Sequence, residues 1–138
     1  MKLVAALALA VSLAVVFAAA GCGSSSPVAP YAPPITETFS GSLVLGGSNI
    51  HVFTVGHVGD VDATITAEAP ISFLPLGMIL GSWDGTTCTP GYQSNIAQQG
   101  TSLGGTTTAT GAFCVRIFDL ASIPAGVTVT YTVVVTHP

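Results

Sequence analysis

The sequence predicts an all-β fold, an antiparallel β-sandwich of jelly-roll-like type with seven to eight strands, formed by residues 35–138. Apolar and polar residues alternate with a period of two almost throughout this range, and helical periodicity is absent. The same range is rich in Val, Ile, Thr, Phe and Gly, which favour strands and turns. Because amphipathic strands must bury one face and no helices are expected to cover them, we expect two sheets packed face to face.

Turn residues bound each expected strand, as Gly46–Asn49 and Asp84-Gly85 do. The clearest alternation places Val61, Ala63, Ile65 and Ala67 on one face of a strand. A stretch rich in Gly, Pro, Gln and Asn, from Thr86 to Gly100, predicts a long loop, and the Thr-rich segment after it predicts an edge strand. The expected strands are Ile35–Leu45, Ile50–Val55, Val61–Glu68, Leu76–Trp83, Thr101–Thr110, Gly111–Phe118 and Val127–Thr136.

A basic and apolar leader precedes this domain. Lys2 is followed by an apolar run, Leu3–Ala20, which is the pattern of a secretory signal helix. The small residues that end in Cys22 resemble a bacterial lipobox. That resemblance implies that residues 1–21 are a cleaved lipoprotein signal peptide and that Cys22 carries fatty chains such as palmitate. The alternatives are an uncleaved N-terminal membrane anchor and ordinary signal cleavage nearby without lipid.

Residues 22–34 are expected to be a Ser/Pro-rich tether between Cys22 and the domain. Its prolines favour an extended chain, which could hold a domain some 30 Å from a bilayer. A proline-rich ligand for a recognition domain is the alternative interpretation. Lipidation would make the protein an exported, membrane-anchored lipoprotein. Gly23 stands where the lipoproteins retained in the inner membrane often carry Asp, which favours the outer membrane, the cell surface or the periplasm.

The charge of the domain excludes two classes of partner. Arg116 is the only Lys or Arg after residue 34, whereas all six acidic residues of the chain lie there. A domain with a single cation lacks the basic patch that nucleic acid requires, and it would not be attracted to anionic lipid. The expected partners are therefore the membrane, through lipidated Cys22, and an envelope protein or a glycan.

Two cysteines remain in the domain once Cys22 is assigned to lipid. An exported protein is expected to pair Cys88 with Cys114 in a disulfide. The bridge would close a loop of about 27 residues and contribute about 3.5 kcal/mol in the chain-entropy description. The alternative is a reactive or metal-binding thiol pair, but neither a His nor a third Cys lies nearby to complete such a site.

Several segments resemble, in the same order, the bacterial pre-peptidase C-terminal domain. They are Phe53-Thr54-Val55, Val61-x-Ala63-x-Ile65, Leu80-Gly81-x-Trp83-Asp84-Gly85, Gly111-x-Phe113-Cys114-Val115-Arg116-Ile117 and Tyr131-Thr132-Val133. The resemblance extends over residues 36–137 and implies a β-sandwich. Members of that family are mostly non-catalytic appendages of exported enzymes, and some bind polymers or calcium.

Polar and charged residues in one predicted hairpin could in principle bind a metal: His51, His57, Asp60 and Asp62. However, His51 shares its strand face with Phe53, while His57 lies in a turn, so the spacing does not bring the four together. We therefore expect no metal site and no cofactor. His137, next to the end of the chain, is expected to be exposed.

Further residues are candidates for a structural or binding role. Arg116 is expected to form a structural ion pair, most simply with Asp119 or else with Asp84. Trp83 and Tyr92 flank the expected long loop and could stack on a sugar, although core packing is the alternative for Trp83.

Gly100-Thr101-Ser102-Leu103-Gly104 matches the Gly-x-Ser-x-Gly pattern, but no helix is expected after it, so it lacks the strand-to-helix context of a hydrolase's nucleophile elbow. The expected function is that of a lipid-anchored, non-catalytic module of the cell envelope with a protein-interaction or structural role. The alternative is a module that binds carbohydrate or another polymer through the region of Trp83 and Tyr92. An exposed apolar face or a free edge strand would favour the first function.

Overall fold

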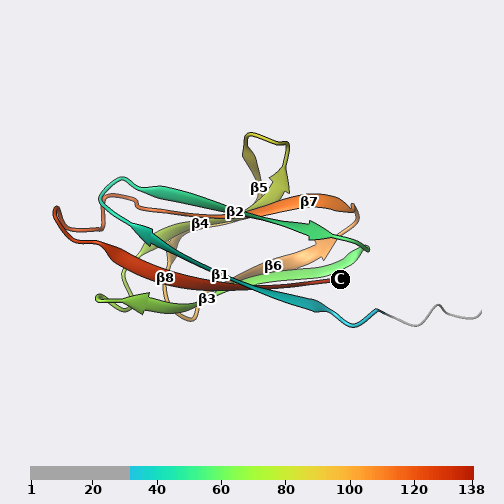
Figure 1. Cartoon of the computed structure of the whole chain (residues 1–138), viewed down its shortest axis with the longest axis horizontal. Coiled ribbons are helices and arrows are strands. Elements are labelled where there is room, and N and C mark those ends of the chain that lie inside the picture. Colours follow the sequence, from blue (N-terminus) through green and yellow to red (C-terminus); the bar gives the residue numbers. More distant parts are fainter. Residues whose placement is uncertain (1–31) are drawn as a thin grey trace, which may run out of the picture. The chain divides into compact units, whose positions relative to one another are not determined.

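The structure is a computed structural model that describes residues 32–138 (Figure 1). The predicted signal peptide, the lipidation site Cys22 and most of the predicted tether lie outside these residues. Eight strands and no helix are found in the described part. The strands are β1 (Ile35–Leu43), β2 (Ser48–Val55), β3 (Gly59–Ala69), β4 (Leu76–Trp83), β5 (Cys88–Ala97), β6 (Ser102–Thr107), β7 (Gly111–Phe118) and β8 (Val129–His137).

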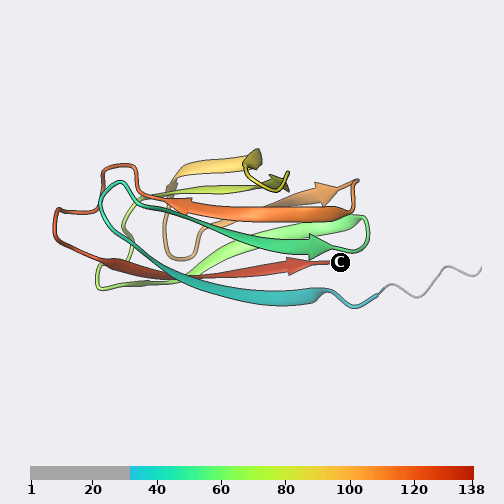
Figure 2. The ribbon, with the colours of Figure 1, turned by 45° about the horizontal axis from the view of Figure 1, so that its top comes forward.

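The strands form two antiparallel sheets of four that lie one above the other (Figure 2). Sheet A has the order β1-β8-β3-β6, and sheet B has the order β2-β7-β4-β5. Consecutive strands lie in opposite sheets except for the β4–β5 hairpin, and this arrangement is the topology of a jelly roll. The predicted all-β, antiparallel sandwich is therefore confirmed.

One hydrophobic core fills the space between the sheets. It takes alternate residues from the inner faces, as the period of two predicts. Strand β8 is the clearest case, because Val129, Tyr131, Val133 and Val135 are buried while the residues between them are not. The other fully buried members include Leu43, Val55, Ile65, Leu76, Met78, Val115, Ile117 and Ile123.

The long loop predicted for Thr86–Gly100 is wrong, because most of it is strand β5. β5 pairs with β4 from Trp83 opposite Cys88 to Leu76 opposite Ala97. Because β5 is an edge strand, most of its side chains face solvent, and their polar character hides the strand in the sequence pattern. The edge strand predicted after it is confirmed as β6.

A β-bulge changes which side chains of β3 are buried. The pairing of β3 with β8 shifts between Ile65 and Ala67. An extra residue in a strand reverses the alternation beyond it. As a result Ala67 is exposed, although the sequence places it with Val61, Ala63 and Ile65, and Glu68 is buried instead.

The antiparallel pairing gives the sandwich two distinct ends. At the proximal end, the first residue of β1 pairs with His137 near the chain's C-terminus. The loops of residues 56–58, 84–87 and 108–110 lie at this end. The distal end, opposite to it, is formed by the loops of residues 44–47, 70–75, 98–101 and 119–128 (Figure 1).

Candidate functional site

The outer face of sheet B is apolar. On β7 the side chains of Phe113, Val115 and Ile117 point inward, so Cys114, Arg116 and Phe118 point outward, as the sequence predicts. In the neighbouring strand β2, Val52 pairs with Cys114 and Ile50 pairs with Arg116. These two aliphatic side chains are therefore on the outer face, where they are 41% and 40% exposed respectively.

A small second core supports this face from below. It consists of Ile79 and the disulfide, with Trp83 and Phe118 packed against them. We call the exposed surface made by Ile50, Val52, Trp83, Arg116 and Phe118 the sheet-B face. Core packing was the alternative interpretation of Trp83. The indole is half-buried and packs against the disulfide in this small second core.

The predicted disulfide between Cys88 and Cys114 is confirmed, with a Cα–Cα distance of 5.8 Å. It joins the edge strand β5 to β7, two strands that are separated in the sheet by β4. The bridge therefore holds the β4–β5 hairpin against the outer side of sheet B. The Trp83 indole packs against this disulfide.

Trp83 and Tyr92 do not form one site. Trp83 pairs with Cys88 and lies on the outer side of sheet B, whereas Tyr92 pairs with Leu80, whose side chain belongs to the main core. The two aromatic rings thus lie on opposite faces of the sheet. The predicted combined platform is wrong, because a register shift between Leu80 and Gly81 in the β4–β5 pairing leaves Tyr92 opposite Leu80, on the core side of the sheet.

Tyr92 instead lines a cleft between the edge strands β5 and β6. Its phenol lies directly over Gly105, where a Cβ atom would meet it. The cleft has a volume of about 300 Å³, and Val61, Leu80 and Phe113 contribute apolar side chains to it. No charged residue lines it.

The ion pair predicted between Arg116 and Asp119 is not formed, nor is one with Asp84. The Arg116 Nε donates a hydrogen bond to the Ser48 hydroxyl at 2.7 Å, and the guanidinium lies 4.9 Å from the centre of the Phe118 ring. Arg116 points outward from the strand, whereas Asp119 comes after its end and turns inward. The two side chains therefore diverge.

Asp119 binds backbone amides at the distal end. Its carboxylate accepts hydrogen bonds from the N–H groups of Gly46, Ser122 and Ile123 at 2.8, 2.8 and 3.0 Å. Burial alone would raise the pKa of Asp119, but these bonds outweigh it and the pKa is lowered. Asp119 thereby fixes the β7–β8 loop to the β1–β2 turn.

The histidines take up separate structural roles. The His51 ring stacks on Phe39 and shares a hydrogen bond of 2.7 Å with the Tyr131 hydroxyl, and burial lowers the pKa of His51. The expectation that His137 is exposed is wrong. It is 1% exposed, and its Nε2 lies 2.9 Å from a carboxylate oxygen of Glu37. Pairing of β8 with β1 up to this residue covers its ring.

No metal site is assembled from the described residues. Within residues 32–138 there is no group of three or more His, Cys, Asp or Glu side chains that could hold an ion. Asp62 lies in β3, where its carboxylate accepts hydrogen bonds from Thr64 and Ser102. The hypothetical cluster of His51, His57, Asp60 and Asp62 is not brought together.

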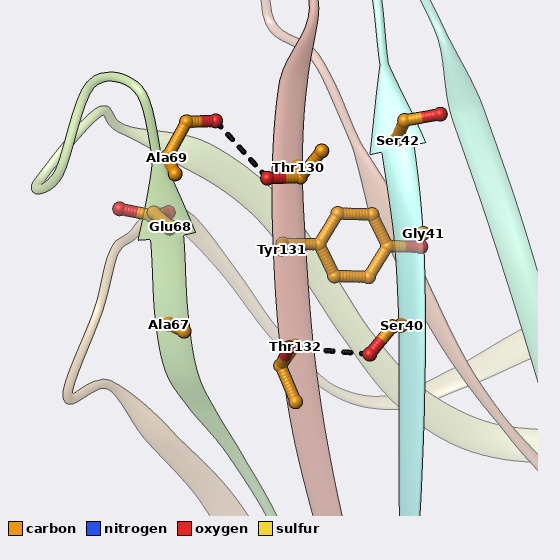
Figure 3. A pocket seen from close by; sticks show the side chains of 9 residues that line it. All are labelled: Ser40, Gly41, Ser42, Ala67, Glu68, Ala69, Thr130, Tyr131 and Thr132. Carbon is orange, nitrogen blue, oxygen red and sulfur yellow. Dashed lines mark hydrogen bonds between the residues drawn. The ribbon is translucent and has the colours of Figure 1, made fainter.

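The outer face of sheet A differs in kind, because it is covered by hydroxyl groups. A shallow groove of about 510 Å³ runs over it between β1, β8 and β3 (Figure 3). Ser40 and Thr132 meet across the groove at 3.2 Å, and Thr130 donates to the Ala69 carbonyl. The ring of Tyr131 covers Gly41 on the other side of the sheet. Hydroxyls that bind one another in this way describe an ordinary solvated face.

Glu68 is a buried carboxyl that sequence reasoning missed. Its Oε2 accepts a hydrogen bond from the Gln99 N–H at 3.1 Å, while Oε1 is buried without a partner among the described residues. Burial raises the pKa of Glu68, although the backbone N–H groups of Gln99, Phe73 and Leu74 act against it. The bulge that turns this side chain inward left no signal in the sequence.

Two solved structures are similar to this chain. The crystal structure of the Yersinia pseudotuberculosis-derived mitogen is similar, with a TM-score of 0.56 and 15% identity over 77% of this chain and 88% of that chain. The periplasmic lysozyme inhibitor PliG of Aeromonas hydrophila, which acts on g-type lysozyme, gives a TM-score of 0.49 and 14% identity, with coverage of 73% and 84%. No family profile and no curated protein matches the sequence.

The likeness to the mitogen is one of fold alone. The resemblance to the pre-peptidase C-terminal domain remains a prediction from the sequence. As for the membrane, no helix among residues 32–138 has the length and hydropathy needed to cross a bilayer.

Proposed function

We propose that this chain is a non-catalytic protein-interaction module of the cell envelope, anchored through lipid on Cys22. The sheet-B face is the observation that carries the proposal. An antiparallel sheet usually presents polar side chains on its solvent side, and sheet A does so. Sheet B instead presents aliphatic and aromatic groups, and such a face is typical of a surface that a partner covers.

The composition of the sheet-B face favours a protein partner. Trp and Arg are the residues most enriched among the energetically dominant positions of protein interfaces. Here Trp83 rests on a disulfide and Arg116 rests on Phe118, so both are preorganised. Preorganised side chains lose less conformational entropy on binding.

Charge narrows the class of partner further. Arg116 is the only Lys or Arg of the described residues, and the aliphatic Ile50 is opposite it in the sheet. Among the described residues, only Ser48 accepts a hydrogen bond from its guanidinium. We therefore expect a partner that presents a carboxylate surrounded by apolar side chains.

Export and anchoring rest on the leader. The lipobox-like sequence before Cys22 supports lipidation, and the disulfide between Cys88 and Cys114 is consistent with an oxidising compartment. The experiment is the intact mass of the protein extracted from its native membrane. A mass that begins at Cys22 and is raised by acyl chains is expected. An unmodified Cys22 would contradict the anchor.

The interaction itself can be tested by site-specific photo-crosslinking in intact cells. A photoreactive residue in place of Val52, on the sheet-B face, is expected to give one dominant crosslinked envelope protein. The same residue in place of Thr132, on the outer face of sheet A, is the matched control and should not crosslink to it.

Adding Arg116→Gln to the Val52 variant should weaken that crosslink at least several-fold, because the carboxylate of the partner would lose its counter-charge. Equal crosslinking from Val52 and Thr132, or insensitivity to Arg116→Gln, would count against the proposal.

A second candidate function is the binding of a carbohydrate or polymer, now at the cleft between β5 and β6. The observation that favours it is Tyr92, which is 46% exposed at the edge of an uncharged cleft and could stack on a sugar. Tyr92→Ala should then abolish retention on immobilised envelope glycans while leaving the melting temperature within a few degrees. Retention by the variant equal to that of the wild type would remove this candidate.

A further inference from the structure

The distal end of the sandwich exposes apolar side chains on three separate loops. Two belong to the β1–β2 turn, two to the β3–β4 loop and one to the β7–β8 loop. Their exposed fractions are large for aliphatic and aromatic groups: Val44 54%, Leu45 49%, Ile71 36%, Phe73 60% and Leu120 42%. We call this set the distal apolar end.

Hydrogen bonds hold two of these loops together. The carboxylate of Asp119 accepts from the N–H of Gly46, and the N–H of Asp119 donates to the Gly47 carbonyl at 2.9 Å. These bonds place Val44 and Leu45 beside the loop that carries Leu120. The apolar tips are therefore presented by a braced structure.

The third loop presents its aromatic residue under strain. Phe73 has a φ of 64°, a left-handed conformation that is unfavourable for a bulky residue. The backbone N–H groups of Phe73 and Leu74 lie near the buried carboxyl of Glu68 and favour its ionised form. Strained residues of this kind concentrate at functional sites. The benzyl side chain of Phe73 is exposed to solvent in this conformation.

Charges are distributed so that the distal end has no exposed carboxylate. The acidic groups that reach solvent lie towards the proximal end, on β1, on the first residues of β3 and in the β4–β5 turn: Glu37, Asp60, Asp62 and Asp84. The two acidic residues nearest the distal end, Glu68 and Asp119, are 6% and 8% exposed. Contact of this end with an apolar phase would therefore bury no exposed carboxylate.

We propose that the distal apolar end inserts into the apolar layer of a lipid bilayer, as a second membrane contact of the anchored protein. The exposed side chains come from three loops, and a fluid hydrocarbon phase accommodates them without a preformed cavity. Burial of exposed apolar groups in the acyl boundary supplies the driving force. Attraction to anionic headgroups plays no part, because the domain has one cation.

The length of the chain before the domain permits this arrangement, a step that rests on the proposed lipidation of Cys22. Residues 22–34 could span at most about 45 Å when fully extended. The eleven residues of β3 extend for about 36 Å along the sandwich. The anchor and the distal end can therefore reach the same bilayer, with the domain's long axis turned towards it.

The test uses the processed full chain in phosphatidylcholine vesicles whose acyl chains carry bromine, a short-range quencher of indole fluorescence. Phe73→Trp is introduced together with Trp83→Phe, so that one indole reports the distal end. The matched control is Val58→Trp in the same background, because Val58 is 59% exposed in the proximal β2–β3 loop. Should Trp83→Phe prevent folding, the spectrum of the wild type is subtracted from that of Phe73→Trp alone.

Insertion predicts a blue-shifted emission at position 73 and quenching several-fold greater than at position 58. An unquenched, water-exposed indole at position 73 in protein that floats with the vesicles would overturn the inference and leave the anchor intact. A blue shift without quenching would show that a protein or a second copy covers this end, which also overturns it. If the protein fails to float, the inference fails, and the intact mass then shows whether the lipid anchor has failed too.

Discussion

The two buried carboxyl groups at the distal end differ in their hydrogen-bond partners, and their pKa values shift in opposite directions. Both Glu68 and Asp119 are almost inaccessible. Both oxygens of Asp119 accept backbone N–H bonds, and its pKa is lowered. One oxygen of Glu68 has no partner, and its pKa is raised.

We predict that Glu68→Gln removes a pH dependence of stability. Because the folded-state pKa of Glu68 lies above its unfolded value, protonated Glu68 stabilises the fold below the unfolded pKa, and this contribution is lost as pH rises through the folded pKa. Glutamine mimics the protonated group. The difference in unfolding free energy between the variant and the wild type should therefore shift in favour of the variant as the pH rises from 4 to 7, as measured by urea unfolding.

Glu68→Ala is the control for that measurement, because it also removes the hydrogen bond that the carboxylate accepts from the Gln99 N–H. It should destabilise the protein by about 1–3 kcal/mol at both pH values. A Glu68→Gln variant whose stability relative to the wild type is the same at pH 4 and pH 7 would contradict the assignment.

At the scale of single residues, the sequence predicted pairs that follow from composition and missed those that depend on the direction of a side chain. The disulfide could be predicted because Cys88 and Cys114 were the two cysteines left in an exported domain. The partner of Arg116 could not be predicted, since it depends on the end of β7, after which the chain turns Asp119 inward. Glu68 required knowledge of a bulge one residue long.

At the scale of elements, strands with clear turn residues at their ends were predicted with their bounds, as β4 and β7 show. Both lie in the centre of sheet B, where a neighbour on each side demands regular strand geometry. The edge strand β5 was missed because only one side of it pairs and most of its side chains face solvent. The prediction that Trp83 and Tyr92 share a site failed as well, because a register shift in the pairing of β5 with β4 turns Tyr92 to the other face of the sheet.

The disulfide should matter most for this edge element. We expect Cys88→Ser combined with Cys114→Ser to lower the free energy of unfolding by about 3 kcal/mol, because the loop between the two residues is no longer closed. Reduction of the wild type should lower the melting temperature by as much as the double substitution does. A melting temperature unchanged by both treatments would remove the bridge from the account of stability.

At the scale of the whole molecule, the two sheets share one core but present different outer surfaces. Hydroxyl groups cover the outer face of sheet A, the sheet-B face is apolar, and the distal end carries apolar loops. This asymmetry could not be predicted from alternation alone, because a period of two does not say which face is covered by the other sheet. In our proposals, the distal apolar end faces lipid and the sheet-B face contacts a protein.

Because a single core joins all eight strands, we predict that residues 32–138 fold without the preceding segment and unfold in one transition. Two signals test this independently. Far-ultraviolet circular dichroism reports both sheets, whereas the fluorescence of Trp83, the only tryptophan, reports the small core outside sheet B. Coincident urea midpoints are expected, since the disulfide and β4 couple that small core to the main one. An earlier fluorescence midpoint would mean that the sheet-B face loosens before the sandwich unfolds, and the preorganisation on which the protein-interaction proposal depends would be lost.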